Sequence, residues 1–158
     1  MKLDQIDQQI LQHLQENARI TNAELAEKVG LSPTPCLRRL RRLETEGIIK
    51  GYHAEVNREA LGVNVTVVTL VKLEREDDRT LKDFEAHIKK RPEVMECYLV
   101  TGKFDYFIRV VIPSLAAYDA FLSEVILRRQ NVVVESIVTL REVERKVVTP
   151  LPASLFRN

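Results

Sequence analysis

The segment from Ser32 to Gly47 constrains the fold of this chain more than any other, because it predicts a helix with one apolar and one basic face. Ser32 suits the N-cap, Pro33 suits the first helical position, and Gly47 suits a left-handed stop. At 100° per residue, one stripe collects the apolar side chains of Cys36, Leu37, Leu40 and Leu43. The opposite face is centred on Thr34, Pro35, Arg38 and Arg42 and is flanked by Arg39 and Arg41.

A second helix is predicted directly before this segment. Thr21 and Glu24 have the spacing of a capping box, in which each side chain satisfies a free backbone N–H group. A four-residue turn that contains Gly30 then leads into the arginine-rich helix. This arrangement is typical of a helix-turn-helix, whose second helix enters the major groove of DNA by its N-terminal half. The alternative is a solvated amphipathic helix, but the four arginines have no carboxylate at helical spacing before Glu44 and Glu46.

The outward face of the arginine-rich helix predicts which residues contact DNA. Thr34 and Arg38 are expected to reach base edges, with Pro35 beside them. Ser32 is expected to cap the helix first and to contact a phosphate second. Phosphate contacts, which position a protein without specifying sequence, are expected from Arg39, Arg41 and Arg42.

The charge of the chain supports only a local DNA-binding patch. The net charge is +1 at pH 7, and the first 62 residues hold equal numbers of basic and acidic side chains, whereas residues 32–53 are net basic. No run approaches the roughly 18 apolar residues of a membrane span, and the N-terminus lacks the pattern of a secretory signal. We therefore expect a cytoplasmic, nucleoid-associated protein without a membrane partner.

The chain divides into two predicted domains of an α+β fold. A first helix capped by Asp4 completes a three-helix, winged-helix-like domain over residues 1–51, and residues 52–62 are predicted as a linker with an extended strand. Residues 63–158 form the second domain. Its predicted strands are 63–73, 94–101, 105–112 and 132–143, and its helices begin at Thr80 and Leu115. This βαββαβ order indicates a ferredoxin-like sandwich.

Both faces of the predicted sheet are apolar. Val68 and Leu70 alternate with Val67, Thr69 and Val71, although the two helices of a ferredoxin-like fold cover only one face. An uncovered apolar face favours association, most simply with a second copy by two-fold symmetry. The alternative is that strand ends or the C-terminal tail fold back over this face.

No pattern in the sequence predicts catalysis or metal binding. His13, His53 and His87 are scattered, and Cys36 and Cys97 lie far apart without a paired-cysteine spacing. The sequence contains no Gly-rich phosphate loop, metal-spaced cluster or nucleophile motif. We therefore expect no catalytic residues, no metal, no cofactor and no enzymatic activity.

Several short motifs follow one another along nearly the whole chain. In the first half they are Leu3-Asp4, Asp7, Ile10-Leu11, residues 22–31, residues 32–36, Arg38-Arg39, Leu43-Glu44, Gly47-Ile48-Ile49 and Gly51-Tyr52. In the second half the motif is Thr101-Gly102-Lys103-Phe104-Asp105-Tyr106. In order and spacing, these motifs resemble the Lrp/AsnC family, the leucine-responsive and asparagine regulators or feast/famine transcription factors of bacteria and archaea.

The resemblance implies an amino-acid-sensing regulator. It implies homodimers, commonly assembled as octamers of four dimers, and an amino acid bound between dimers near the 101–106 hairpin. From the family pattern, the effector-binding residues are Leu99, Thr101, Gly102 and Asp105 on one wall and Val134 and Ser136 on another. Gly102 lets backbone N–H groups approach a carboxylate closely, and Asp105 offers an anion to an ammonium group. The alternative is that Gly102 and Asp105 only shape a turn.

Two functions share the arginine-rich helix. One is a sequence-specific transcriptional regulator that binds double-stranded DNA and responds to an amino acid. The other is a ligand-independent, nucleoid-associated architectural protein, which differs from the first at the effector pocket. A stand-alone amino-acid-binding module acting on an enzyme would leave residues 21–47 unexplained.

Overall fold

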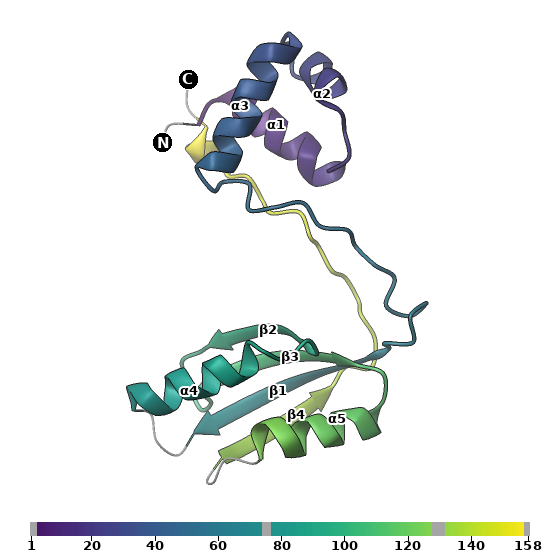
Figure 1. The fold of residues 1–158 in the computed structure, drawn as a ribbon, viewed down its shortest axis with the longest axis vertical. Coiled ribbons are helices and arrows are strands. Elements are labelled where there is room, and N and C mark those ends of the chain that lie inside the picture. The colour runs from purple at the N-terminus through teal and green to yellow at the C-terminus, as the bar shows by residue number, and fades with distance from the viewer. Residues whose placement is uncertain (1–2, 74–76, 128–131, 157–158) are drawn as a thin grey trace. The chain divides into compact units, whose positions relative to one another are not determined.

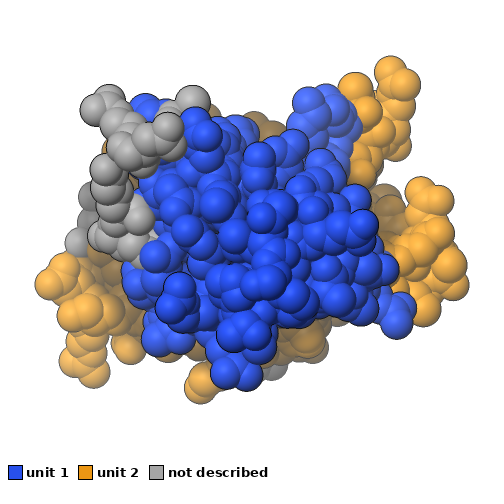
Figure 2. Space-filling view, turned by 90° about the horizontal axis from the view of Figure 1, so that it is seen from above, with its two compact units in different colours: residues 1–55, 144–158 blue, residues 56–143 orange. Residues whose placement is uncertain are grey.

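The computed structural model describes residues 3–73, 77–127 and 132–156, which form two compact units (Figure 1). The first unit comprises residues 1–55 and 144–158, and the second comprises residues 56–143 (Figure 2). The chain therefore passes between the units twice. The domain boundaries at residues 51 and 62 stay a prediction, and the grouping of the C-terminal segment with the N-terminal helices was not foreseen.

Three helices build the first unit: α1, Gln5–Glu16; α2, Asn22–Lys28; and α3, Pro33–Thr45. Asp4 caps α1 as predicted, and Thr21 and Glu24 form the predicted capping box at α2. The prediction for α3 is only half right. Ser32 occupies the N-cap position, but its side chain accepts no capping hydrogen bond.

An apolar core joins these three helices. It contains Ile10 of α1, Leu25 of α2 and Leu43 of α3, each at most 1% exposed. Phe156, which follows a short 3-10 helix at Ala153–Leu155, packs into the same core. Among the described residues of this unit, the only strand-like pairing is an isolated bridge between Leu3 and Phe156, so no hairpin wing accompanies the helices.

The second unit is the predicted βαββαβ sandwich. Its elements are β1, Val65–Leu73; α4, Asp78–Ile88; β2, Val94–Leu99; β3, Tyr106–Ile112; α5, Leu115–Phe121, followed by a π-helical turn at Leu122–Ile126; and β4, Val132–Val138. The strands form one antiparallel sheet in the order β2-β3-β1-β4. This order confirms the ferredoxin-like topology and places β2 and β4 at opposite edges.

Five bounds of the second unit differ from the prediction. β1 begins at Val65 rather than at residue 63, β2 ends at Leu99 rather than at residue 101, and β3 begins at Tyr106 rather than at residue 105. The other two differences have a local cause. α4 begins at Asp78 rather than Thr80, because the Asp77 carboxylate accepts hydrogen bonds from the N–H groups of the helix's first turn. β4 ends at Val138 rather than at residue 143, because Val138 already pairs with Val67 near the start of β1.

The linker strand is a further difference. Residues 52–62 contain no strand in the structure. A strand needs a hydrogen-bonded neighbour, and none of the described residues pairs with this segment. Residues 58–62 form a hydrogen-bonded turn.

α4 and α5 cover one face of the sheet (Figure 1). The opposite face, called the open sheet face below, carries apolar side chains that are exposed or half-buried: Val68, Leu70, Tyr98, Phe107, Val133 and Ile137. The C-terminal tail was the alternative cover, but residues 144–158 belong to the first unit. The predicted uncovered apolar face is therefore present in the second unit.

Candidate functional site

The exposed side of α3 carries hydroxyl and guanidinium groups. Ser32, Thr34, Arg38 and Arg41 are exposed, and Pro35 is half-buried beside them. The Ser32 oxygen accepts no capping hydrogen bond, and the O–H group of this side chain can donate to a phosphate. Such a surface can donate hydrogen bonds to phosphates and to base edges. We call these four exposed residues the α3 donor face.

Arg39 and Arg42 do not share this environment, because both bind carboxylates at the start of α1. Asp7 is fully buried. Its Oδ1 lies 2.9 Å from Arg39 Nη1, and its Oδ2 lies 2.6 Å from Arg42 Nη2. Arg39 Nη1 also lies 2.7 Å from Asp4 Oδ2. These four side chains form an ion-pair cluster that ties α3 to α1.

The ion-pair cluster also keeps Asp4 charged. Burial raises the pKa of Asp4, but the backbone N–H of Asp7 and the guanidinium of Arg39 lower it, and the pKa ends below its ordinary value. The N–H of Asp7 donates to Asp4 Oδ1 at 2.9 Å, so the same carboxylate caps α1. Helix capping and helix-helix attachment are thus combined in one cluster.

The sequence reasoning missed these ion pairs because it looked for carboxylates only within α3. Asp7 lies 32 residues before Arg39 and 35 before Arg42. The available signal was Asp7 itself, which shares a helical face with the buried Ile10 and Leu11. A carboxylate on a buried face requires a charged or hydrogen-bonding partner.

The predicted effector residues at the β2–β3 hairpin lie close to one another. Leu99 is 62% exposed at the end of β2, and Thr101 and Gly102 are exposed in the turn. Gly102 has φ +125°, which favours glycine. Asp105 anchors the hairpin to β1, because its Oδ2 accepts a hydrogen bond from the N–H of Leu73 at 2.7 Å. Asp105 therefore shapes the turn, as the alternative interpretation required, while its second carboxylate oxygen has no hydrogen bond to the described residues.

Val134 and Ser136 lie away from this hairpin, because β4 and β2 are opposite edges of the sheet. Val134 packs against the core under the helices. The Ser136 hydroxyl lies 2.6 Å from the Tyr118 hydroxyl, which lies 2.9 Å from that of Thr69. Within one chain, β3 and β1 therefore lie between β2 of the hairpin and the strand that carries Val134 and Ser136.

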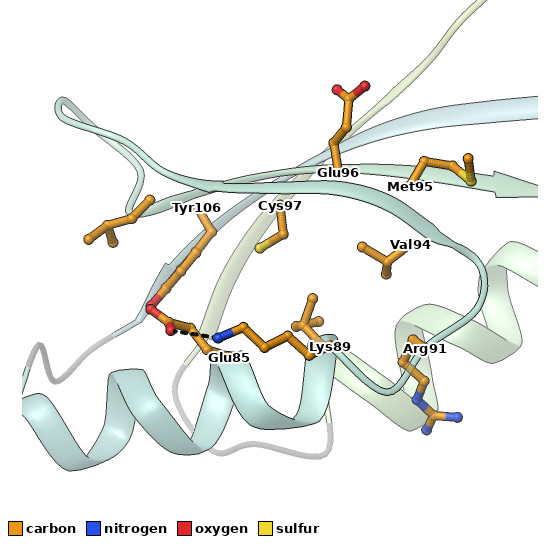
Figure 3. A pocket seen from close by; sticks show the side chains of 10 residues that line it. Glu85, Lys89, Arg91, Val94, Met95, Glu96, Cys97 and Tyr106 are labelled. Carbon is orange, nitrogen blue, oxygen red and sulfur yellow. Dashed lines mark hydrogen bonds and ion pairs between the residues drawn. The ribbon is translucent and has the colours of Figure 1, made fainter. Parts of the chain in front are cut away.

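A pocket of about 380 Å³ lies between α4 and β2 (Figure 3). Its lining includes Leu99, Cys97 and Tyr106 from the strands and Glu85 and Lys89 from α4. The Tyr106 hydroxyl donates to Glu85 Oε1 at 3.2 Å, and Lys89 Nζ lies 3.6 Å from Glu85 Oε2. Burial, reinforced by Glu85, raises the pKa of Tyr106 to about 12 and also raises the pKa of Cys97. Both groups are therefore neutral at pH 7, and the pocket combines apolar walls with one ion pair.

Two kinds of site are absent from residues 3–73, 77–127 and 132–156. No helix in these ranges is long and apolar enough to cross a membrane. No group of three or more His, Cys, Asp or Glu side chains in them could hold a metal ion.

Two family models match the chain. Residues 3–50 match a winged helix-turn-helix DNA-binding model, which spans α1 to α3. Residues 66–148 match the Lrp/AsnC ligand binding domain, which spans the four-stranded sheet.

Named relatives agree with both matches. A leucine-responsive regulatory protein of Rhizobium meliloti is 41% identical over 91% of this chain and 93% of its own length, and one of Escherichia coli K12 is 43% identical over 82% and 79%. Among solved structures, a transcriptional regulator of Neisseria meningitidis in complex with L-Met has a TM-score of 0.91 and 37% identity, covering 98% of this chain and all of that one. An AsnC family regulator of Agrobacterium tumefaciens has a TM-score of 0.87 and 36% identity, covering 96% and 98%.

Proposed function

This chain belongs to the Lrp/AsnC family of DNA-binding transcriptional regulators with a ligand-binding domain, and we propose that an amino acid bound between dimers sets its DNA-binding state. The observation that carries the DNA-binding part is the α3 donor face, which combines two hydroxyls with two guanidiniums on an exposed helix. Thr34 and Arg38 read base edges, with Pro35 beside them. Ser32 and Arg41 contact phosphates.

The ion-pair cluster changes the roles proposed for the other two arginines. Arg39 Nη1 and Arg42 Nη2 bind the carboxylates of Asp4 and Asp7, so the main role proposed for these two arginines is to hold α3 in place. Recognition therefore depends on fewer arginines than the sequence predicts. The relatives described above are regulators, and this function includes no catalytic step.

An amino acid is the proposed effector because its zwitterion fits the hairpin chemistry and a similar regulator is solved with L-Met. The exposed turn at Thr101 and Gly102 offers backbone donors to a carboxylate, and Asp105 offers its second oxygen to an ammonium. Since Val134 and Ser136 lie at the other edge of the sheet, a neighbouring dimer completes the second wall.

Self-association follows from the open sheet face. A second copy covers this face by two-fold symmetry, and dimers assemble further, commonly to octamers in this family. An effector bound between dimers shifts assembly by its different affinity for the two assembly states. Assembly then sets how many α3 helices engage neighbouring DNA half-sites. The proposed location is the cytoplasm, on the nucleoid.

A thermal-shift panel with the twenty amino acids, each at millimolar concentration, tests the sensing function. At about 100 times its dissociation constant, a ligand of the native state adds roughly 2.7 kcal/mol of stability. For a chain of this size, we expect a rise of on the order of 5–10 °C in the unfolding midpoint with one amino acid or a few related ones. A flat panel would favour the architectural alternative, in which the protein binds DNA without a ligand.

Asp105→Asn separates the charge of this residue from its structural contact. The amide oxygen of asparagine can still accept the hydrogen bond from Leu73, while the anion offered to the ammonium is lost. We expect the effector identified in the panel to bind at least about 10-fold more weakly by calorimetry. The control is Asp119→Asn, an exposed carboxylate on α5. Equal effector affinity in both variants would remove Asp105 from the site.

A further inference from the structure

The C-terminal segment is part of the DNA-binding unit in space, although neither family model assigns its last ten residues. The helix-turn-helix model covers residues 3–50, and the ligand-binding model ends at residue 148. Yet residues 144–158 group with the N-terminal helices. Phe156 is 6% exposed and is the one aromatic side chain among the described buried residues of that helical core. The core of α1 to α3 is therefore incomplete without the end of the chain.

Separate contacts hold this segment along its length. Arg145 Nη1 lies 3.3 Å from Glu55 Oε1. The Thr149 N–H donates to Gln15 Oε1 at 2.6 Å, and Gln15 Nε2 donates to the Thr149 carbonyl at 3.2 Å. Leu151 and Phe156 then reach the apolar core. Near residues 147 and 149 a pocket of about 360 Å³ remains against α1, so the attachment is concentrated at a few points.

The last contact lies next to the cluster that supports α3. Phe156 forms a bridge with Leu3, and the next residue, Asp4, caps α1 and binds Arg39 of α3. Burial of an aromatic side chain is among the largest single contributions to a small core. Loss of Phe156 is therefore expected to destabilise the contacts between α1 and α3.

We propose that residues 144–156 are a strap that completes the DNA-binding unit and ties it to β4 as a second covalent connection. With only the connection at residues 55 and 56, the helices could reorient about one linker. The strap restricts that freedom, because its far end is fixed in the helical core. When the helices reorient less, α3 meets paired DNA half-sites at a higher effective concentration.

Hydrogen exchange measured peptide by peptide on the full chain tests whether Phe156 stabilises the DNA-binding unit. In Phe156→Ala, we expect the amides of α1 and α3 to exchange on the order of 100-fold faster, because a buried phenyl ring is lost. Amides of the central strands β1 and β3 should exchange as in the wild type. The control is Leu155→Ala, which removes a neighbouring side chain that is 57% exposed. Equal exchange rates in the two variants would show that Phe156 does not stabilise α1 and α3.

The second covalent connection is tested by lengthening the strap while its contacts in the helical core are kept. Ten Gly and Ser residues inserted between Val143 and Glu144, at an exposed part of the chain, leave every contact of Phe156 available. We expect wild-type exchange in α1 and α3 but about 3–10-fold weaker binding to a DNA fragment that the wild-type protein selects from random sequence. Wild-type DNA affinity in this variant would overturn the second connection as a positioning device.

Discussion

Replacing Asp7 by alanine is expected to lower the free energy of unfolding of the first unit by about 3–5 kcal/mol. Asp7 is fully buried and binds both Arg39 and Arg42, so its removal leaves Arg42 without its carboxylate and Arg39 with Asp4 alone. Its Oδ2 also accepts a hydrogen bond from the N–H of Asp4 at 3.1 Å. Denaturant unfolding followed by hydrogen exchange in α1 and α3 measures the loss, and DNA binding should fall with it.

Two variants show whether the charge or the helix cap causes this loss. Asp4→Ala removes the cap but only the more exposed carboxylate, so we expect a loss of about 1 kcal/mol. Asp7→Asn keeps the shape and one acceptor but removes the charge, and its loss should lie between those of the two alanine variants. If Asp7→Ala cost no more than Asp4→Ala, the buried ion pairs would not support α3.

A glutamate in place of Val68 is expected to prevent formation of the proposed dimer. Val68 lies at the centre of the open sheet face, between Arg109 on β3 and Ile137 on β4. In the monomer the new carboxylate stays in water beside Arg109, so the fold is retained. In the dimer it would be buried without a full set of partners, which costs several kcal/mol and raises the dissociation constant on the order of 1,000-fold.

Sedimentation velocity at micromolar concentration measures this change. The wild type should sediment as a dimer or larger, and Val68→Glu as a monomer. The matched control is Leu115→Glu, which places the same charge on an exposed leucine of α5 away from the open sheet face. A dimeric Val68→Glu variant would show that the protein associates through another surface.

Features that depend on a pattern within one helix or strand could be predicted from the sequence. The helices α1 to α3, the cap at Asp4, the capping box of Thr21 and Glu24 and the βαββαβ order all follow from local periodicity and end signals. The resemblance supplied the family, which the matches over residues 3–50 and 66–148 support. Local patterns suffice here because each signal and its consequence lie within a few residues.

Contacts between segments that are distant in the sequence could not be predicted from such local patterns. The basic face of α3 has no carboxylate partner within its own helix, because Asp7 lies on α1 and only the folded chain brings Arg39 and Arg42 to it. Chain order places Phe156 in the predicted second domain, whereas in the structure it packs with Leu3 and the N-terminal helices. In both cases the decisive contact joins side chains that lie more than thirty residues apart in the sequence.

The most direct test of the account is the salt dependence of DNA binding by three arginine variants. Affinities for the selected DNA fragment and for random DNA are measured between 50 and 200 mM salt. Arg38→Ala should lose about 1–3 kcal/mol of preference for the selected fragment. Arg41→Ala should weaken both DNAs alike and reduce the salt slope by about 0.9 for each phosphate contact removed. Arg19→Ala, an exposed arginine outside α3, serves as the charge-matched control and should change neither quantity. If Arg38→Ala and Arg41→Ala behaved like Arg19→Ala, the α3 donor face would not be the surface that reads DNA.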